Sequence, residues 1–109
     1  MNIGITLTSS LEVGEEYIKV TETVAKTLAT QDMGIVYGGT NYGMMAALAS
    51  SYKNAGGKNL IGVMAKDLMV VTKGYTAYKG LDRSYTEESM EDRKHRIIEL
   101  SDAFIILPG

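Results

Sequence analysis

The sequence predicts an α/β fold with a doubly wound parallel sheet, and two observations support this. Short apolar runs at residues 3–7, 34–37, 60–64 and 103–107 alternate with longer stretches of helical spacing. One of these runs passes through a glycine turn straight into a helical pattern. Strands that alternate with helices form parallel sheets, since each crossover returns the chain to the same end. The predicted order is strand, helix, strand, helix, strand, loop, helix, strand.

Composition limits the class of protein before any motif is considered. The 109 residues suit one domain, residues 1–109, with a net charge of −2 and no basic patch. There is no cysteine, no signal-peptide pattern and no apolar run of membrane-spanning length. We therefore expect a cytoplasmic protein whose partners include neither nucleic acid nor a membrane.

The first two helices are predicted from apolar residues at helical spacing. In the first helix these residues are Tyr17, Val20, Val24 and Leu28. In the second they are Met44, Met45, Leu48 and Tyr52, and the helix is expected to stop at Gly56-Gly57.

The stretch from Lys66 to Arg83 has a less regular pattern. Residues 69–71 fit either a short strand or a short helix, and a loop is expected near residues 73–80. Tyr75 and Tyr78 in this loop are candidates to stack on a purine, or are simply surface tyrosines. Residues 84–87 read Ser-x-x-Glu, a capping box, which predicts a third helix from there to about residue 100.

The last apolar run, residues 103–107, requires cover on both faces, and no helix follows it in the sequence. Either a partner chain covers it, or the sequence is part of a longer domain. We favour the second interpretation, in which the sheet is truncated after its fourth main strand.

The glycine turn is the first candidate binding site. Gly38, Gly39 and Gly43 link the second strand to the second helix, whose free N–H groups suit a phosphate or carboxylate. The spacing is neither G-x-G-x-x-G nor a P-loop. A tight turn that binds no ligand is the alternative interpretation.

The third predicted helix carries the second candidate. Met90, Ile97 and Ser101 fall on one stripe, and Arg93 and Lys94 lie beside or within it. These two cations either reach water or an acid such as Glu91 or Asp102, or face an anionic ligand above the strand ends. His95 falls on the outer side of the helix and is not a catalytic candidate.

Three motifs occur in family-like order: residues 36–45 with Gly38-Gly39-x-x-x-Gly43, Ser89-Met90-x-x-Arg93-Lys94, and residues 103–109 ending in Pro-Gly. Together with Ser9-Ser10 they resemble the LOG (LONELY GUY) family of nucleoside 5′-monophosphate phosphoribohydrolases. Some members of that family have been labelled lysine decarboxylases. The resemblance implies a Rossmann-like fold, a homodimer, no cofactor and no metal. It also implies hydrolysis of AMP or a related nucleotide to a free base and ribose 5-phosphate.

The resemblance also implies roles for particular residues. Arg93 is the functional arginine, with Lys94 beside it and Met90 near the base or ribose. The same resemblance implies that the substrate or its phosphate is bound by Ser9, Ser10, Gly38, Gly39, Thr40, Asn41, Gly43 and Gly109.

The chain departs from the family pattern at several positions. Thr8, Thr40, Asn41 and Glu91-Asp92 differ from it. The family motif P-G-G-x-G-T-x-x-E, which carries the glutamate for bond cleavage, begins at residues 108–109, where the sequence stops.

Two other functions fit the sequence. A nucleotide or molybdenum-cofactor carrier of the same fold would bind without cleavage. A pyridoxal-phosphate decarboxylase fits poorly, because no lysine stands out as a Schiff-base candidate.

Overall fold

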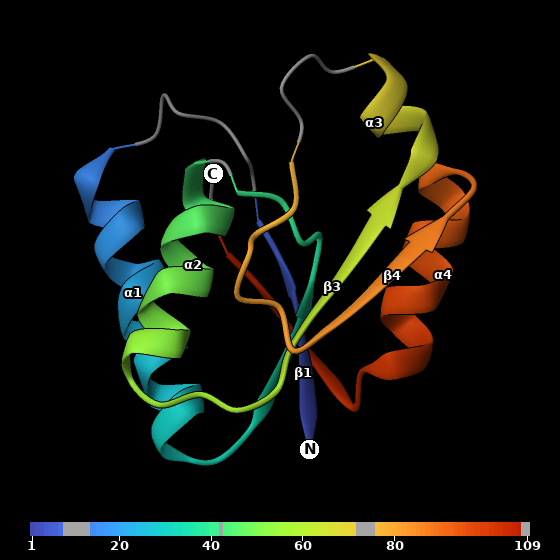
Figure 1. The fold of residues 1–109 in the computed structure, drawn as a ribbon. Coiled ribbons are helices and arrows are strands. Elements are labelled where there is room, and N and C mark those ends of the chain that lie inside the picture. The colour runs from blue at the N-terminus through green and yellow to red at the C-terminus, as the bar shows by residue number, and fades with distance from the viewer. Residues whose placement is uncertain (8–13, 42, 72–75, 108–109) are drawn as a thin grey trace.

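The structure is a computed structural model that describes residues 1–7, 14–41, 43–71 and 76–107, with only the backbone described at residues 69–71. Within these residues a parallel sheet has strand order β4-β3-β2-β1-β5 (Figure 1). Its strands are β1 (Asn2–Thr6), β2 (Gly34–Tyr37), β3 (Leu60–Ala65), β4 (Arg83–Glu87) and β5 (Ala103–Ile106). The predicted doubly wound α/β fold is confirmed.

Helices cover both faces of this sheet. The helices α1 (Glu15–Thr30) and α2 (Gly43–Asn54) lie side by side over one face, and α4 (Met90–Leu100) lies on the other (Figure 1). The short helix α3 (Lys66–Val71) follows β3 directly, so of the two forms expected for residues 69–71 the helix is correct. From β1 the chain moves outward through β2 and β3 to β4, and then returns through α4 to β5 on the other edge of the sheet.

The two faces of the sheet bury different side chains of the same strands. Ile35 and Leu60 pack against α1 and α2, while Val36, Ile61 and Val63 pack toward α4. All five are fully buried. Since successive strand residues point to opposite faces, each of these central strands supplies both cores.

The predicted start of the third long helix is wrong. Ser84 and Glu87 belong to the strand β4, where Tyr85 pairs with Val63, so the sheet has five strands rather than four. The helix begins at Met90, after Ser89, whose hydroxyl accepts a 3.1 Å hydrogen bond from the Asp92 backbone N–H. The aromatic and β-branched residues at 85 and 86 favour a strand, and this preference outweighs a capping-box spacing.

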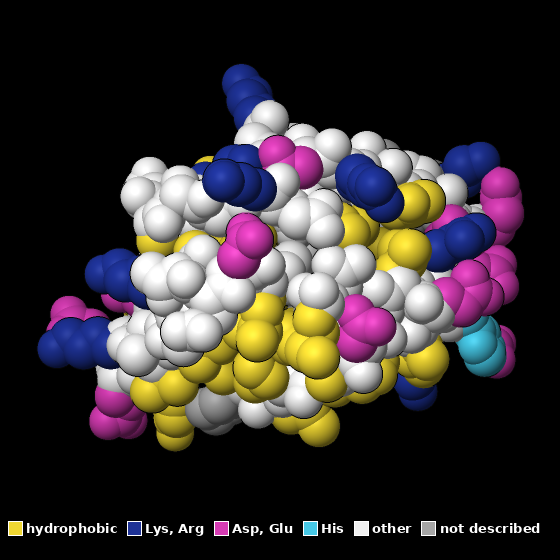
Figure 2. All heavy atoms as spheres, turned by 90° about the horizontal axis from the view of Figure 1, so that it is seen from below, with side chains coloured by type: hydrophobic (Ala, Val, Ile, Leu, Met, Phe, Trp, Pro, Cys, Tyr) yellow, Lys and Arg dark blue, Asp and Glu magenta, His cyan; other side chains and the backbone are white. Residues whose placement is uncertain are grey.

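The edge strand β5 is covered on one side only. Ile105 packs against the core beneath α1 and α2, whereas Phe104 is 50% exposed and Ile106 is 80% exposed. A space-filling view shows hydrophobic side chains gathered at the surface on one side of the molecule (Figure 2). No helix in the described residues is long and apolar enough to span a membrane.

Candidate functional site

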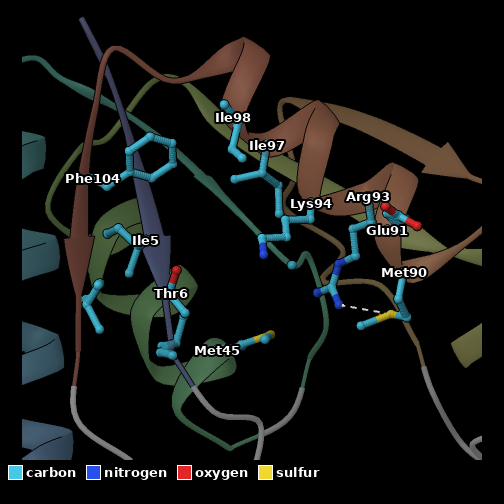
Figure 3. Close-up of a pocket in the computed structure, with 13 residues that line it drawn as sticks. Ile5, Thr6, Met45, Met90, Glu91, Arg93, Lys94, Ile97, Ile98 and Phe104 are labelled. Atoms are coloured by element: carbon cyan, nitrogen blue, oxygen red, sulfur yellow. Dashed lines mark hydrogen bonds between the residues drawn. The ribbon is translucent and has the colours of Figure 1, made fainter.

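A groove of about 820 Å³ lies between α4 and the strands β1 and β5. Side chains of Thr6, Met45, Ile97 and Phe104 line it together with Arg93 and others (Figure 3). One end of the groove reaches Gly38, at the carboxyl end of β2. In open parallel sheets the carboxyl ends of the strands are where ligands bind, so this end of the groove is the candidate site.

Arg93 is the main charged feature of the site. Its side chain leaves α4 toward the groove and only 8% of the residue is exposed (Figure 3). Arg93 Nε donates a 2.8 Å hydrogen bond to the Val63 carbonyl oxygen, and Nη1 donates to Met90 Sδ at 3.6 Å. A buried cation is costly unless it is hydrogen-bonded, and these contacts meet part of that requirement. They also fix the direction of the guanidinium.

Gly38 contacts Arg93 directly. A Cβ at Gly38 would overlap Arg93 Nη2 and would lie 3.0 Å from both Arg93 Cζ and Met45 Cε. The guanidinium therefore lies over the bare main chain of the glycine turn. The two features that the sequence singled out separately are brought together here.

Gly39 allows the turn to pass close over β3. Its φ is +76°, and a Cβ there would lie 3.0 Å from Gly62 Cα. A Cβ at Gly62 would in turn lie 2.8 Å from Gly39 Cα. The backbones of the turn and of β3 meet here without side chains between them, which requires glycine at both positions.

The segment at residues 76–78 is hydrogen-bonded to the glycine turn. The Asn41 N–H donates to the Thr76 carbonyl oxygen at 3.0 Å, and the Tyr78 N–H donates to Gly39 at 2.9 Å. Thr40, between them, bridges to Ala77 and is buried. The backbone N–H of Asn41 is therefore already used within the protein, although the residue as a whole is exposed.

The other predicted site residues are placed as follows. Met90 and Lys94 line the groove beside Arg93, and Gly43 opens α2 with a φ of +52°. Tyr78 packs against the core under α1 and α2, and His95 is exposed as predicted. Ser9, Ser10, Tyr75 and Gly109 lie outside the described residues.

The site uses residues that the sequence analysis did not single out. Gly62 had a readable signal, because a glycine inside an apolar strand often marks a close backbone approach. The Val63 carbonyl had none, since a backbone acceptor is available at every position. In the part of the chain that is described, no group of three or more His, Asp or Glu residues could hold a metal ion.

The fold and the groove define a class: a Rossmann-like α/β protein with a fixed cation near the carboxyl ends of its central strands. No family model matches the chain. Curated relatives do match. A protein named cytokinin riboside 5′-monophosphate phosphoribohydrolase from Rhodococcoides fascians is 32% identical over 96 residues, which is 88% of this chain and 47% of that protein. The protein of the same name, LOG, from Oryza sativa subsp. japonica is 34% identical over 86 residues, 79% of this chain and 34% of its own length.

These relatives confirm the resemblance to the LOG family that the sequence motifs predicted. The chain spans about half the length of the first relative and about a third of the second. Solved structures share the fold. The molybdenum cofactor carrier protein from Chlamydomonas reinhardtii aligns with a TM-score of 0.78 at 20% identity, over 99% of this chain and 62% of that one. The molybdenum cofactor binding protein from Rippkaea orientalis gives 0.78 at 18% identity, over 99% and 63%.

Proposed function

We propose that the protein is a nucleoside 5′-monophosphate phosphoribohydrolase, with AMP as the substrate to test first. The observation that carries the proposal is Arg93, a cation held at the carboxyl end of the sheet against the glycine turn. The curated relatives are named for this reaction on cytokinin riboside 5′-monophosphates, which supports the reaction class.

The phosphate is proposed to bind at the glycine turn, beside the guanidinium of Arg93 that contacts Gly38. Gly38, Gly39, Thr40, Asn41 and Gly43 form this cradle, and the start of α2 adds the positive end of its dipole. Asn41 contributes through its side chain, because its N–H already donates to Thr76.

The remaining predicted contacts complete the proposed binding site. Ser9, Ser10 and Gly109 add phosphate contacts. Met90 and Lys94 line the groove on the side of α4, where the ribose or base would lie.

In the proposed reaction, water adds at C1′ of the ribose while the N-glycosidic bond breaks and the base leaves with a proton. The sugar passes through an oxocarbenium-like state, which a nearby carboxylate stabilises, by analogy with glycoside hydrolysis. The resemblance gives that role to a glutamate of the motif that starts at Pro108-Gly109. Arg93, which is always protonated, holds the phosphate or ribose and balances charge that develops in the transition state.

The test is to incubate the protein, in a form that carries the glutamate motif, with AMP and to separate adenine and ribose 5-phosphate by chromatography. Arg93→Ala is expected to lower the rate by about 100-fold, the typical cost of removing a charge-stabilising donor. Arg96→Ala is the matched control, because Arg96 lies on the same helix and pairs with Glu87 and Glu99 at the surface. Equal rates for the Arg93 variant and the unmodified protein would remove Arg93 from the mechanism.

A second candidate is a carrier that binds a nucleotide or molybdenum cofactor without cleaving it. Proteins described as molybdenum cofactor carriers have this fold, although at 18–20% identity the likeness concerns the fold alone. AMP that binds and is recovered intact would favour the carrier. The homodimer, which the family resemblance implies, and the cytoplasmic location, which the composition implies, stay predictions.

A further inference from the structure

The guanidinium of Arg93 is held by three different segments of the chain. Nε donates to the Val63 carbonyl oxygen of β3, and Nη1 donates to Met90 Sδ, one turn earlier on α4. Nη2 occupies the space beside Gly38, where any other residue would place its Cβ. Each nitrogen thus has its own neighbour, so the position of the group depends on all three.

We propose that Gly38 is a positioning residue for Arg93. The guanidinium fills the space that a side chain at position 38 would occupy. Gly38 therefore acts on the ligand through the position of Arg93. The expected consequence for AMP rests on the proposed function, whereas the coupling between the two residues does not. This role differs from the close approach of main chain and phosphate that the sequence predicted for Gly38.

The backbone at Gly38 does not itself require glycine. Its φ lies outside the left-handed region, unlike that of Gly39 at +76°. Alanine therefore fits the backbone at position 38, and the atom in its way is the far end of a flexible side chain. The fold is expected to tolerate alanine, and the guanidinium is expected to move.

The displaced guanidinium can move in one direction, toward the groove that Arg93 lines. Met45 Cε would also lie 3.0 Å from the new Cβ, so the turn is closed on that side. The displaced group would turn into the groove and lose the hydrogen bond from Nε to Val63. Lysine at position 93 does not replace it, because a single terminal nitrogen cannot reach Val63 and also lie over Gly38.

The test is a double-mutant cycle with Gly38→Ala, Arg93→Ala and the double variant, all in the full chain. AMP affinity is measured by calorimetry. Gly38→Ala is expected to weaken AMP binding about tenfold when Arg93 is present, and less than about twofold when Arg93 is already alanine. Equal weakening in both backgrounds would overturn the proposal, because Gly38 would then act on the ligand by itself.

A readout without nucleotide separates this proposal from the proposed function. The Arg93 Nε–H should exchange slowly with water in the unmodified protein, as measured by NMR, and quickly in Gly38→Ala. Gly14→Ala is the matched control, because Gly14 is exposed and its Cβ would meet nothing closer than 3.7 Å. If the Arg93 Nε–H still exchanges slowly in Gly38→Ala, Gly38 does not position Arg93, whether or not AMP binds.

The melting temperature is a third measurement. It keeps the proposal testable even if Gly38→Ala folds poorly. Gly38→Ala is expected to lower the Tm by about 5 °C with Arg93 present, through loss of the hydrogen bond to Val63. The double variant should show no further loss relative to Arg93→Ala. If Gly38→Ala unfolds and the double variant does not recover, the space beside Gly38 serves something other than Arg93.

Discussion

The two faces of the sheet differ in what they enclose. Beneath α1 and α2 the sheet meets a closed apolar layer in which Leu48 and Tyr52 are at most 1% exposed. Beneath α4 the layer is smaller and opens into a groove that holds the buried Arg93 and the exposed Phe104. One face is built for stability, and the other combines packing with a charged group.

This contrast arises within single strands. In β2, Ile35 faces the closed layer and Val36 faces α4, although the two are adjacent in the sequence. Because successive side chains of a strand point to opposite faces of the sheet, substitutions at adjacent strand residues test different faces. Four substitutions test this difference between the faces.

Leu48→Ala should have the largest effect on stability. Leu48 is fully buried beneath α2, so alanine leaves a cavity that costs about 3 kcal/mol. Chemical denaturation measures this loss. Ile98→Ala on α4 is the control, since Ile98 is 48% exposed and should cost far less. Similar losses for both variants would mean that the two faces are packed alike.

Gly62→Ala should have the next largest effect. The new Cβ would lie 2.8 Å from Gly39 Cα and 2.8 Å from Leu81 Cδ1, and the backbone at Gly39 cannot yield cheaply. Overpacking of this kind costs about 2 kcal/mol, read as a lower denaturation midpoint. Lys26→Ala, at an exposed position within α1, should leave that midpoint nearly unchanged. An unchanged denaturation midpoint for Gly62→Ala would contradict the close approach of the backbones at Gly39 and Gly62.

Tyr37→Phe should stabilise the closed face by about 1 kcal/mol. Among the described residues, the buried Tyr37 hydroxyl has no hydrogen-bond partner. Burial, and secondly the neighbouring Tyr78, raise the pKa of Tyr37 above its ordinary value. Because the pKa of Tyr37 is higher in the folded than in the unfolded protein, the free energy of unfolding is unaffected below the pKa of a free tyrosine, about 10. The free energy of unfolding falls as the pH rises above that value, since the unfolded protein then loses the phenol proton first.

The pH dependence of Tyr37→Phe checks this argument. The unmodified protein should lose stability above about pH 10, and the phenylalanine variant should lose less, because one buried phenol is gone. Tyr17→Phe is the control, since Tyr17 is exposed. Identical alkaline unfolding curves for the unmodified protein and Tyr37→Phe would contradict the buried, neutral phenol.

Ile106→Thr should have the smallest effect, within about 0.5 kcal/mol. Ile106 is 80% exposed on the open side of β5, whereas its neighbour Ile105 packs into the closed layer. Ile105→Thr, measured in the same way, should cost clearly more. A large loss for Ile106→Thr in the full chain would show that this side chain is covered in solution.

Most of the fold followed from the alternation of apolar runs with helical patterns, because burial dictates both periods. The strand β4 did not, since residues 83–87 are exposed or half-buried and carry no apolar run. The true cap at Ser89 becomes clear only when that strand is recognised.

The candidate site was predictable in part. The sequence pointed to the glycine turn and to Arg93, because glycines and a cation on a core-facing stripe are unusual. It could not show that Gly38 and Arg93 touch, or that Asn41 already donates to Thr76. Both contacts join residues far apart in the sequence, and one of them involves only backbone atoms, which have no sequence signature.

The pairing of the glycine turn with residues 76–78 has a consequence for folding. The turn follows β2, but the partners of Gly39 and Asn41 come only after β3 and α3 along the chain. Such contacts cost loop-closure entropy before they return any stability. We therefore expect the glycine turn to reach its final shape late in folding, after the sheet on which it rests.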